Sequence, residues 1–302
     1  MTTPSFYDAS KVGQFYIPDT AAAISAGLAT NFSAASEDRL RVLLLLVDMQ
    51  VDFIHPDGTL SVPGAVEDTR RTIEWIYKHV STLTTIAASL DSHLPVQIFY
   101  ASWWSDADGN PPSPYTEITV EDVLQGVWIP RYEVEWSREY VQKLSSQAKK
   151  NLMIWPYHTM IGTPGHCLTP ALYEAIAYHS AARQTEPIFL TKGSLPKTEH
   201  YSILEPEVKV PDHPQGTINR SFLDMVATYD VIYIAGQAKS HCVLETVSSM
   251  MRYFNTDIIS KLHVLYDAMS SVAHPTIDFD AIANRAFEEF AKDGLNIVYT
   301  DL

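Results

Sequence analysis

Apolar runs alternate along the chain with amphipathic segments, the pattern of an α/β protein. The run Val42–Val47 is continuously apolar and stops at Asp48, as expected of a parallel strand buried on both faces. Apolar positions then recur with a helical period over residues 65–90. Further strands are predicted over residues 96–100, 188–191, 231–235, 262–266 and 296–299, and further helices over 219–228, about 242–254 and 278–293. This alternation predicts a three-layer α/β/α fold with a mostly parallel sheet of about six strands.

Two segments fit this alternation poorly. Residues 1–40 predict an N-terminal arm, with a short helix in its Ala-rich part, that packs on the domain or on a neighbouring subunit. Residues 41–302 form the single predicted domain. Within it, residues 102–154 are rich in Trp and Pro and predict an insertion. Such an insertion serves as a lid or an interface element, or its aromatic residues form a small core of their own.

Composition narrows the possible partners. The net charge of −15 would repel a phosphate backbone, which argues against nucleic-acid binding. No apolar stretch is long enough to span a bilayer, and the N-terminus lacks the pattern of a secretory signal. Two cysteines, Cys167 and Cys242, are too few to cross-link a fold of 302 residues, so a reducing, cytoplasmic location is expected.

Three polar residues lie where predicted strands end: Asp48, Lys192 and, after a short turn, Cys242. Ligands of open α/β sheets bind at the carboxyl ends of the strands, so these side chains are expected to converge. A thiolate is the useful nucleophile, which the charge of Lys192 would favour and whose proton Asp48 would accept. Cys242 also begins a predicted helix, whose N-terminus favours negative charge. We expect Cys242 to react with alkylating reagents before Cys167.

Four sequence motifs, in order along the chain, resemble those of nicotinamidases and related cysteine hydrolases. They are DMQVDF from Asp48 with GTLSVPGA from Gly58, WPYHTMIGTPG from Trp155, TKG from Thr191 with Tyr201-Ser202, and AGQAKSHCVLETV from Ala235. The resemblance implies the isochorismatase-like hydrolase fold, with Asp48 as general base, Lys192 as its partner and Cys242 as nucleophile. It also implies a cis peptide at Gln237–Ala238 that aims the Ala238 N–H into an oxyanion hole, and a dimer or tetramer. The positions that it assigns to the substrate pocket are Phe53, Trp155, Tyr201, Gln237 and His241.

The metal site of these relatives is predicted to be lost. Nicotinamidases usually bind a divalent metal through an Asp-x-His after the second strand, a later histidine and the histidine of WP-x-H. With the second strand at residues 96–100, Ser102 stands for the aspartate and Trp104 for the histidine, and only His158 remains. One imidazole does not make a transition-metal site, so no cofactor is expected. Trp103 and Trp104 are then expected to form a bulky apolar wall of the pocket near His158.

These observations favour a cysteine-dependent hydrolase of a small amide, ureido or carbamoyl compound that acts through a thioester. Loss of the metal ligands argues against nicotinamide, because in metal-dependent relatives the ion anchors the pyridine nitrogen. The alternatives are a nicotinamidase proper, a catalytically silent homologue that binds a metabolite, and a hydrolase of an ester or vinyl ether.

Overall fold

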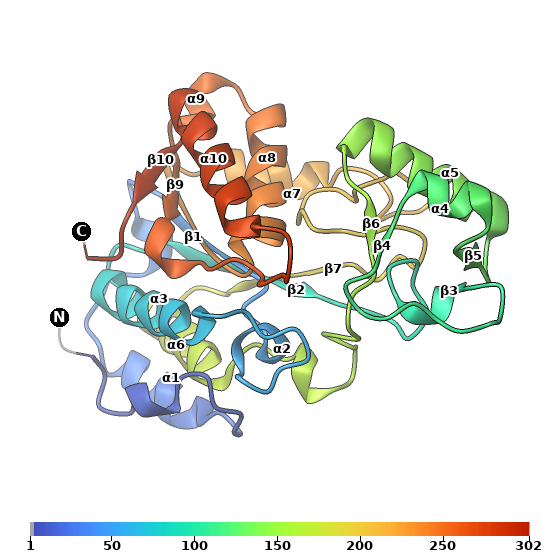
Figure 1. Cartoon of the computed structure of the whole chain (residues 1–302). Coiled ribbons are helices and arrows are strands. Elements are labelled where there is room, and N and C mark those ends of the chain that lie inside the picture. Colours follow the sequence, from blue (N-terminus) through green and yellow to red (C-terminus); the bar gives the residue numbers. More distant parts are fainter. Residues whose placement is uncertain (1–2, 302) are drawn as a thin grey trace.

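The computed structural model describes residues 3–301, and its centre is a six-stranded parallel sheet covered by helices on both faces (Figure 1). This confirms the predicted fold class. The strands lie in the order β10-β9-β8-β1-β2-β7. Their bounds are Val42–Val47 for β1, Thr85–Asp91 for β2, Ile188–Lys192 for β7, Val231–Gly236 for β8, Leu262–Leu265 for β9 and Asn296–Val298 for β10.

Strand β1 is central, and its alternate side chains serve two cores. Leu44 and Leu46 belong to one hydrophobic cluster, whereas Leu43 and Leu45 belong to the other. On the first face lie α3 (Ala65–His79), α6 (Pro170–Arg183) and α1 (Thr20–Leu28). On the second lie α7 (Arg220–Ala227), α8 (Leu244–Tyr253) and α10 (Phe279–Lys292). A continuously apolar strand is therefore explained by burial on both faces.

The N-terminal segment contains one helix, α1, which packs closely on α6. A Cβ added at Gly27 would lie 2.6 Å from the carbonyl oxygen of Tyr178 and 2.8 Å from Ala181 Cβ, so only glycine allows this approach. Before the helix, Tyr16 donates a hydrogen bond to Glu174 over 2.8 Å, and the Asp19 N–H donates to the same carboxylate over 2.7 Å. The segment is thus fixed to α6 of its own chain.

Residues 102–154 form a lobe beside the ends of β2 and β7 (Figure 1). The lobe contains two small antiparallel sheets, which pair β3 with β5 and β4 with β6. Its elements are β3 (Trp104–Ser105), β4 (Glu117–Ile118), α4 (Val120–Gln125), β5 (Ile129–Pro130), α5 (Val134–Lys143), a π-helical turn (Leu144–Ala148) and β6 (Leu152–Met153). Two short helices elsewhere are α2 (Val51–Ile54) and α9 (Thr256–Ile259).

Two predicted elements are wrong, and the errors are linked. The helix predicted over residues 65–90 ends at His79, and the last part of that segment is strand β2. The strand predicted over residues 96–100 is a loop whose aromatic residues Phe99 and Tyr100 are buried. Helical periodicity continued by chance into the run Thr85–Asp91, whose Ala and Ser residues carry little strand preference.

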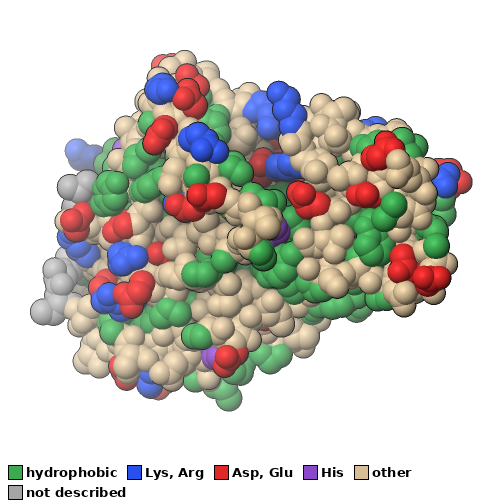
Figure 2. Space-filling model, in the orientation of Figure 1, with side chains coloured by type: hydrophobic (Ala, Val, Ile, Leu, Met, Phe, Trp, Pro, Cys, Tyr) green, Lys and Arg blue, Asp and Glu red, His purple; other side chains and the backbone are tan. Residues whose placement is uncertain are grey.

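The surface carries charges of both signs. Figure 2 shows acidic and basic side chains interspersed with apolar ones over the face in view. Among residues 3–301, no helix is both long and apolar enough to cross a membrane.

Candidate active site

The strand order brings distant residues to one edge of the sheet. Strands β7, β2, β1 and β8 are consecutive neighbours, and the carboxyl end of each leads to a polar group. Asp48 follows β1, Asp91 ends β2 and Lys192 ends β7. After β8, a short turn leads into a π-helical segment, Lys239–Val243, that holds Cys242 and precedes α8.

Lys192 is the centre of this group. Its Nζ lies 2.9 Å from Asp48 Oδ2, 2.9 Å from Asp91 Oδ1 and 3.7 Å from Cys242 Sγ. It also donates to the carbonyl oxygen of His200 over 2.9 Å. The three residues expected to act together are buried, with exposed fractions of 0% for Asp48, 2% for Lys192 and 6% for Cys242. The structure therefore brings acid, amine and thiol into one buried cluster.

The backbone and a serine fix the orientation of Asp48. Its φ of 47° lies in the left-handed region, which turns the chain sharply after β1. Ser89 Oγ donates to Asp48 Oδ1 over 2.6 Å and accepts from the Asp48 N–H over 3.0 Å. The second carboxylate oxygen is left to face Lys192.

Electrostatics set the resting state of the cluster. Burial, reinforced by the charge of Asp91 and opposed by Lys192, raises the pKa of Asp48, so this carboxylate readily accepts a proton. Burial alone would lower the pKa of Lys192, but the charges of Asp48 and Asp91 hold it well above its usual range. The pKa of the Cys242 thiol is raised well above its usual value by burial, since the lowering effect of Lys192 is smaller. The free site is thus a lysine–carboxylate ion pair beside a neutral thiol.

A second polar cluster lies next to the first and contains two residues that sequence reasoning missed. Asp91, His93 and His158 offer ligand atoms that all lie within 4.8 Å of one another, and all three residues are buried. His93 Nε2 is 2.7 Å from Asp91 Oδ2, and His158 Nε2 is 3.6 Å from the same oxygen. The expectation that only His158 remained of the metal ligands is therefore wrong.

The hydrogen bonds of the two imidazoles fit a metal. His93 Nδ1 lies 3.0 Å from the Gly193 carbonyl oxygen and His158 Nδ1 lies 2.7 Å from the Pro156 carbonyl oxygen. A carbonyl only accepts, so Nδ1 carries the proton in each ring, and the lone pair of a neutral ring is on Nε2. Both Nε2 atoms then face a carboxylate, an arrangement that needs a proton or a metal cation between the acceptors. Two imidazoles and a carboxylate suit zinc, iron or manganese.

The missed ligands have a traceable cause. Asp91-Ser92-His93 is an Asp-x-His that starts at the last residue of the second strand, once β2 is placed at Thr85–Asp91. With the second strand wrongly placed at residues 96–100, Ser102 and Trp104 would occupy the positions of the aspartate and the histidine of this motif. The glycine of the TKG motif leaves space for Asp91. At Gly193, with φ of 82°, an added Cβ would lie 2.6 Å from Asp91 Oδ1.

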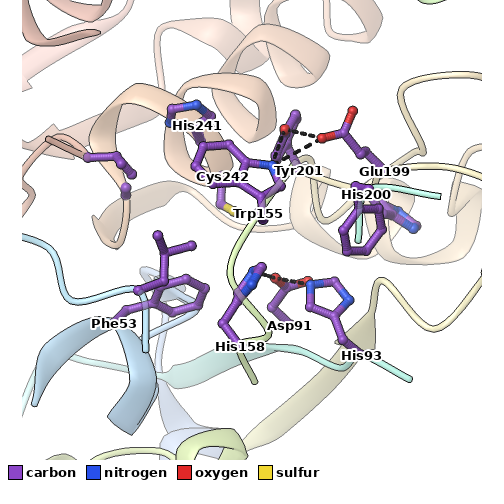
Figure 3. Close-up of a pocket in the computed structure, with 14 residues that line it drawn as sticks. Phe53, Asp91, His93, Trp155, His158, Glu199, His200, Tyr201, His241 and Cys242 are labelled. Carbon is purple, nitrogen blue, oxygen red and sulfur yellow. Dashed lines mark hydrogen bonds and ion pairs between the residues drawn. The ribbon is translucent and has the colours of Figure 1, made fainter. Parts of the chain in front are cut away.

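A pocket opens beside both clusters (Figure 3). Five residues expected to line it from the sequence do so: Phe53, Trp155, His158, Tyr201 and His241. Cys242 and Ala238 also line it, as do four residues with polar side chains that the sequence did not single out, Asp91, His93, Glu199 and His200. Burial lowers the pKa of His241 and of His200 to about 3, so both rings are neutral.

Three expected pocket residues lie elsewhere among the described residues. Trp103 donates to Ser137 Oγ over 2.9 Å and Trp104 donates to the Ile98 carbonyl oxygen over 2.6 Å, and both indoles are buried in the hydrophobic cluster that also covers one face of the sheet. Their expected position beside His158 followed from the misplaced strand. Gln237 precedes a cis peptide to Ala238, and its side chain donates to Asp68 Oδ2 over 2.9 Å, away from the pocket.

Known proteins resemble this chain over nearly its full length. The nicotinamidase of Saccharomyces cerevisiae is 24% identical over 256 residues, which cover 84% of this chain and 98% of the relative. The structure of the yeast nicotinamidase bound to the inhibitor nicotinaldehyde has a TM-score of 0.59 at 22% identity, covering 85% of this chain and 99% of that one. A nicotinamidase/pyrazinamidase of Acinetobacter baumannii has a TM-score of 0.58 at 17% identity, with 88% and 99% covered.

A third relative was solved with a metal. The pyrazinamidase of Pyrococcus horikoshii in complex with zinc has a TM-score of 0.50 at 20% identity, covering 86% of this chain and 99% of that one. No model of a protein family matches the sequence. Because the backbones agree over almost the whole of these relatives, the chain has the isochorismatase-like hydrolase fold, and its sequence is similar to that of a nicotinamidase.

Proposed function

We propose that this protein hydrolyses the C–N bond of a small heteroaromatic carboxamide, such as nicotinamide, through a thioester on Cys242. The observation that carries the proposal is the placement of Lys192 Nζ between Asp48, Asp91 and the sulfur of Cys242. Nicotinamide is included because Asp91 and His93, together with His158, could hold the metal ion that the sequence alone did not predict. A relative that resembles the chain over 98% of its own length is a nicotinamidase, which supports the same substrate class.

In the first half-reaction the thiol proton passes to Asp48 and the sulfur attacks the amide carbon. The resulting oxyanion is stabilised by N–H groups of the turn at Ala238 and Cys242, where the segment that leads into α8 favours negative charge. Collapse of this intermediate breaks the C–N bond, and the amine takes the proton from Asp48 and leaves as ammonia. Lys192 remains protonated throughout and stabilises the thiolate.

In the second half-reaction Asp48 accepts a proton from water, which attacks the thioester carbon. The C–S bond breaks, the carboxylic acid leaves, and the sulfur recovers its proton from Asp48. A divalent metal held by Asp91, His93 and His158 would supply a Lewis acid at the pocket floor and an anchor for a ring nitrogen. Trp155, Tyr201 and Phe53 provide aromatic surfaces for a planar ring.

Release of ammonia tests the proposal directly. We expect the wild-type protein to release ammonia from nicotinamide or pyrazinamide, and hydroxylamine to trap the acyl group as a hydroxamate. Cys242→Ala should lower kcat by roughly 10⁴-fold or more, as loss of a nucleophile does in other hydrolases. Cys167→Ala, at an exposed cysteine, is the matched control. Unchanged turnover by Cys242→Ala would overturn the mechanism, and no ammonia from any amide would favour the silent homologue.

The oligomeric state and the cytoplasmic location stay predictions. Light scattering coupled to gel filtration distinguishes a monomer from the expected dimer or tetramer.

A further inference from the structure

Glu199 is a buried carboxylate of the pocket wall that the proposed chemistry does not use. Its exposed fraction is 3%, and in the chain it directly precedes the two pocket residues His200 and Tyr201. Burial raises its pKa to about 7. Burying a carboxylate costs free energy unless hydrogen-bond donors contact it, so the donors around Glu199 indicate its role.

Two of its donors are the aromatic rings of the pocket. Trp155 Nε1 donates to Glu199 Oε1 over 3.2 Å and to the Tyr201 hydroxyl oxygen over 2.9 Å. Tyr201 in turn donates its hydroxyl to the same Glu199 oxygen (Figure 3). His241 packs edge-on against both rings, with centroid distances of 5.2 Å to Trp155 and 5.4 Å to Tyr201. One carboxylate oxygen of Glu199 therefore fixes the rings of Trp155 and Tyr201, and the ring of His241 packs against both.

The other oxygen faces the insertion. Tyr140, on α5, donates its hydroxyl to Glu199 Oε2 over 3.2 Å and accepts from the Glu199 N–H over 3.1 Å. One turn earlier on the same helix, Trp136 Nε1 donates to the carbonyl oxygen of Lys197 over 2.8 Å. Helix α5 is thus attached twice to the loop between Lys192 and Tyr201, which has the triad lysine at one end and a pocket ring at the other.

We propose that Glu199 is a positioning residue that holds Trp155 and Tyr201 as one wall of the substrate pocket and joins this wall to the insertion through Tyr140. The insertion is then a structural part of the binding site. This inference rests on the proposed function, because it assigns the wall to binding of the planar ring of the amide. Among the described residues, no hydrogen bond links Glu199 to Asp48, Lys192 or Cys242, so its loss should weaken binding more than chemistry.

Steady-state kinetics separate these two effects. Glu199→Leu removes the acceptor of two buried hydroxyl donors, those of Tyr201 and Tyr140. We expect KM for nicotinamide or pyrazinamide to rise at least tenfold while kcat changes less than threefold. Glu199→Gln keeps an acceptor oxygen for Trp155 and Tyr201 and should recover most of the loss. Tyr140→Phe should raise KM as well, and its effect should shrink in the Glu199→Leu background because both changes remove the same link.

The matched controls are Glu139→Gln, an exposed carboxylate on α5, and Tyr132→Phe, an exposed tyrosine of the insertion; both should leave KM unchanged. A fall in kcat as large as the rise in KM, an unchanged KM, or a Gln variant no better than the Leu variant would each overturn the proposal. If Glu199→Leu does not fold, KM and kcat of Glu199→Gln, of Tyr140→Phe and of the double variant test the proposal instead.

A spectroscopic test does not depend on turnover. The near-ultraviolet circular dichroism difference between wild type and Trp155→Phe isolates the signal of the pocket indole. We expect this difference to collapse in the Glu199→Leu background and to persist with Glu139→Gln. An undiminished signal shows that Trp155 keeps its position without Glu199 and refutes the inference. If the wild-type protein releases no ammonia, only the proposed function fails, and this measurement still decides whether Glu199 positions Trp155.

Discussion

Asp91 and Lys192 are register partners at the ends of β2 and β7, and Lys192 Nζ lies 2.9 Å from Asp91 Oδ1. The other oxygen of Asp91 faces His93 and His158. One carboxylate therefore connects the candidate triad with the candidate metal ligands. Burial would raise the pKa of Asp91. The effects of His93 and, next, of the charge of Lys192 are opposite and hold this pKa well below its usual range. A change at Asp91 is expected to disturb both clusters, so tests of either one are better made elsewhere.

The metal is tested at His93. Protein purified without a histidine tag is expected to bind about one zinc, iron or manganese ion per chain, because two imidazoles and a carboxylate converge. His93→Ala should weaken metal binding at least tenfold, measured by elemental analysis and by the visible absorption of the cobalt form. The control is His263→Ala, whose Nδ1 also faces a carbonyl, that of Lys261 at 2.9 Å. Equal metal content in the two variants would contradict the assignment.

Thiol reactivity is expected to be the reverse of the order inferred from the sequence. Cys167 is exposed, whereas Cys242 is buried and its thiol has a raised pKa. Reaction with alkylating reagents needs an accessible thiolate. In the free protein at neutral pH, iodoacetamide should therefore label Cys167 first, as followed by peptide mass spectrometry. Faster labelling of Cys242 would show that the resting thiol is ionised, against the electrostatics of the site.

Acid should destabilise the protein partly through His179. This ring is 1% exposed, lies 3.0 Å from the Leu83 carbonyl oxygen, and burial lowers its pKa to about 4. Because the unfolded chain binds the proton more tightly, stability is lost as pH falls below about 6.5. At pH 5 the loss from this residue is on the order of 2 kcal/mol. Urea unfolding should show a smaller loss between pH 7.5 and 5 for His179→Gln than for wild type; equal losses would exclude His179 as the cause.

Packing of the N-terminal helix is tested at Gly27. In an open helix, Gly→Ala stabilises by roughly 1 kcal/mol. Here the added methyl would meet Tyr178 and Ala181 on α6, so Gly27→Ala should instead destabilise by about 1–3 kcal/mol and expose the segment to proteolysis. Ser25→Ala, at an exposed position of the same helix, serves as the comparison. A more stable Gly27 variant would mean that α1 does not pack on α6 in solution.

The sequence by itself determined the α/β class, the resemblance to nicotinamidases and most of the sheet. Strands such as Val42–Val47 are continuously apolar because helices cover both faces, and that pattern is local. Asp48, Lys192 and Cys242 were predicted to converge because each directly follows an apolar run or begins a predicted helix, and strand ends in a parallel sheet share one edge.

Only the tertiary structure decided where the second strand ends. The run Thr85–Asp91 is buried by its neighbours β1 and β7, and its own residues do not distinguish strand from helix. The position of Asp91 and His93, the candidate metal ligands, depended on that boundary. The position of Trp103 and Trp104 outside the pocket depended on it as well. Glu199 likewise has no local signature, since its three donors come from α5, from Trp155 and from Tyr201. Contacts between residues far apart in sequence are created by folding, so periodicity along the chain does not reveal them.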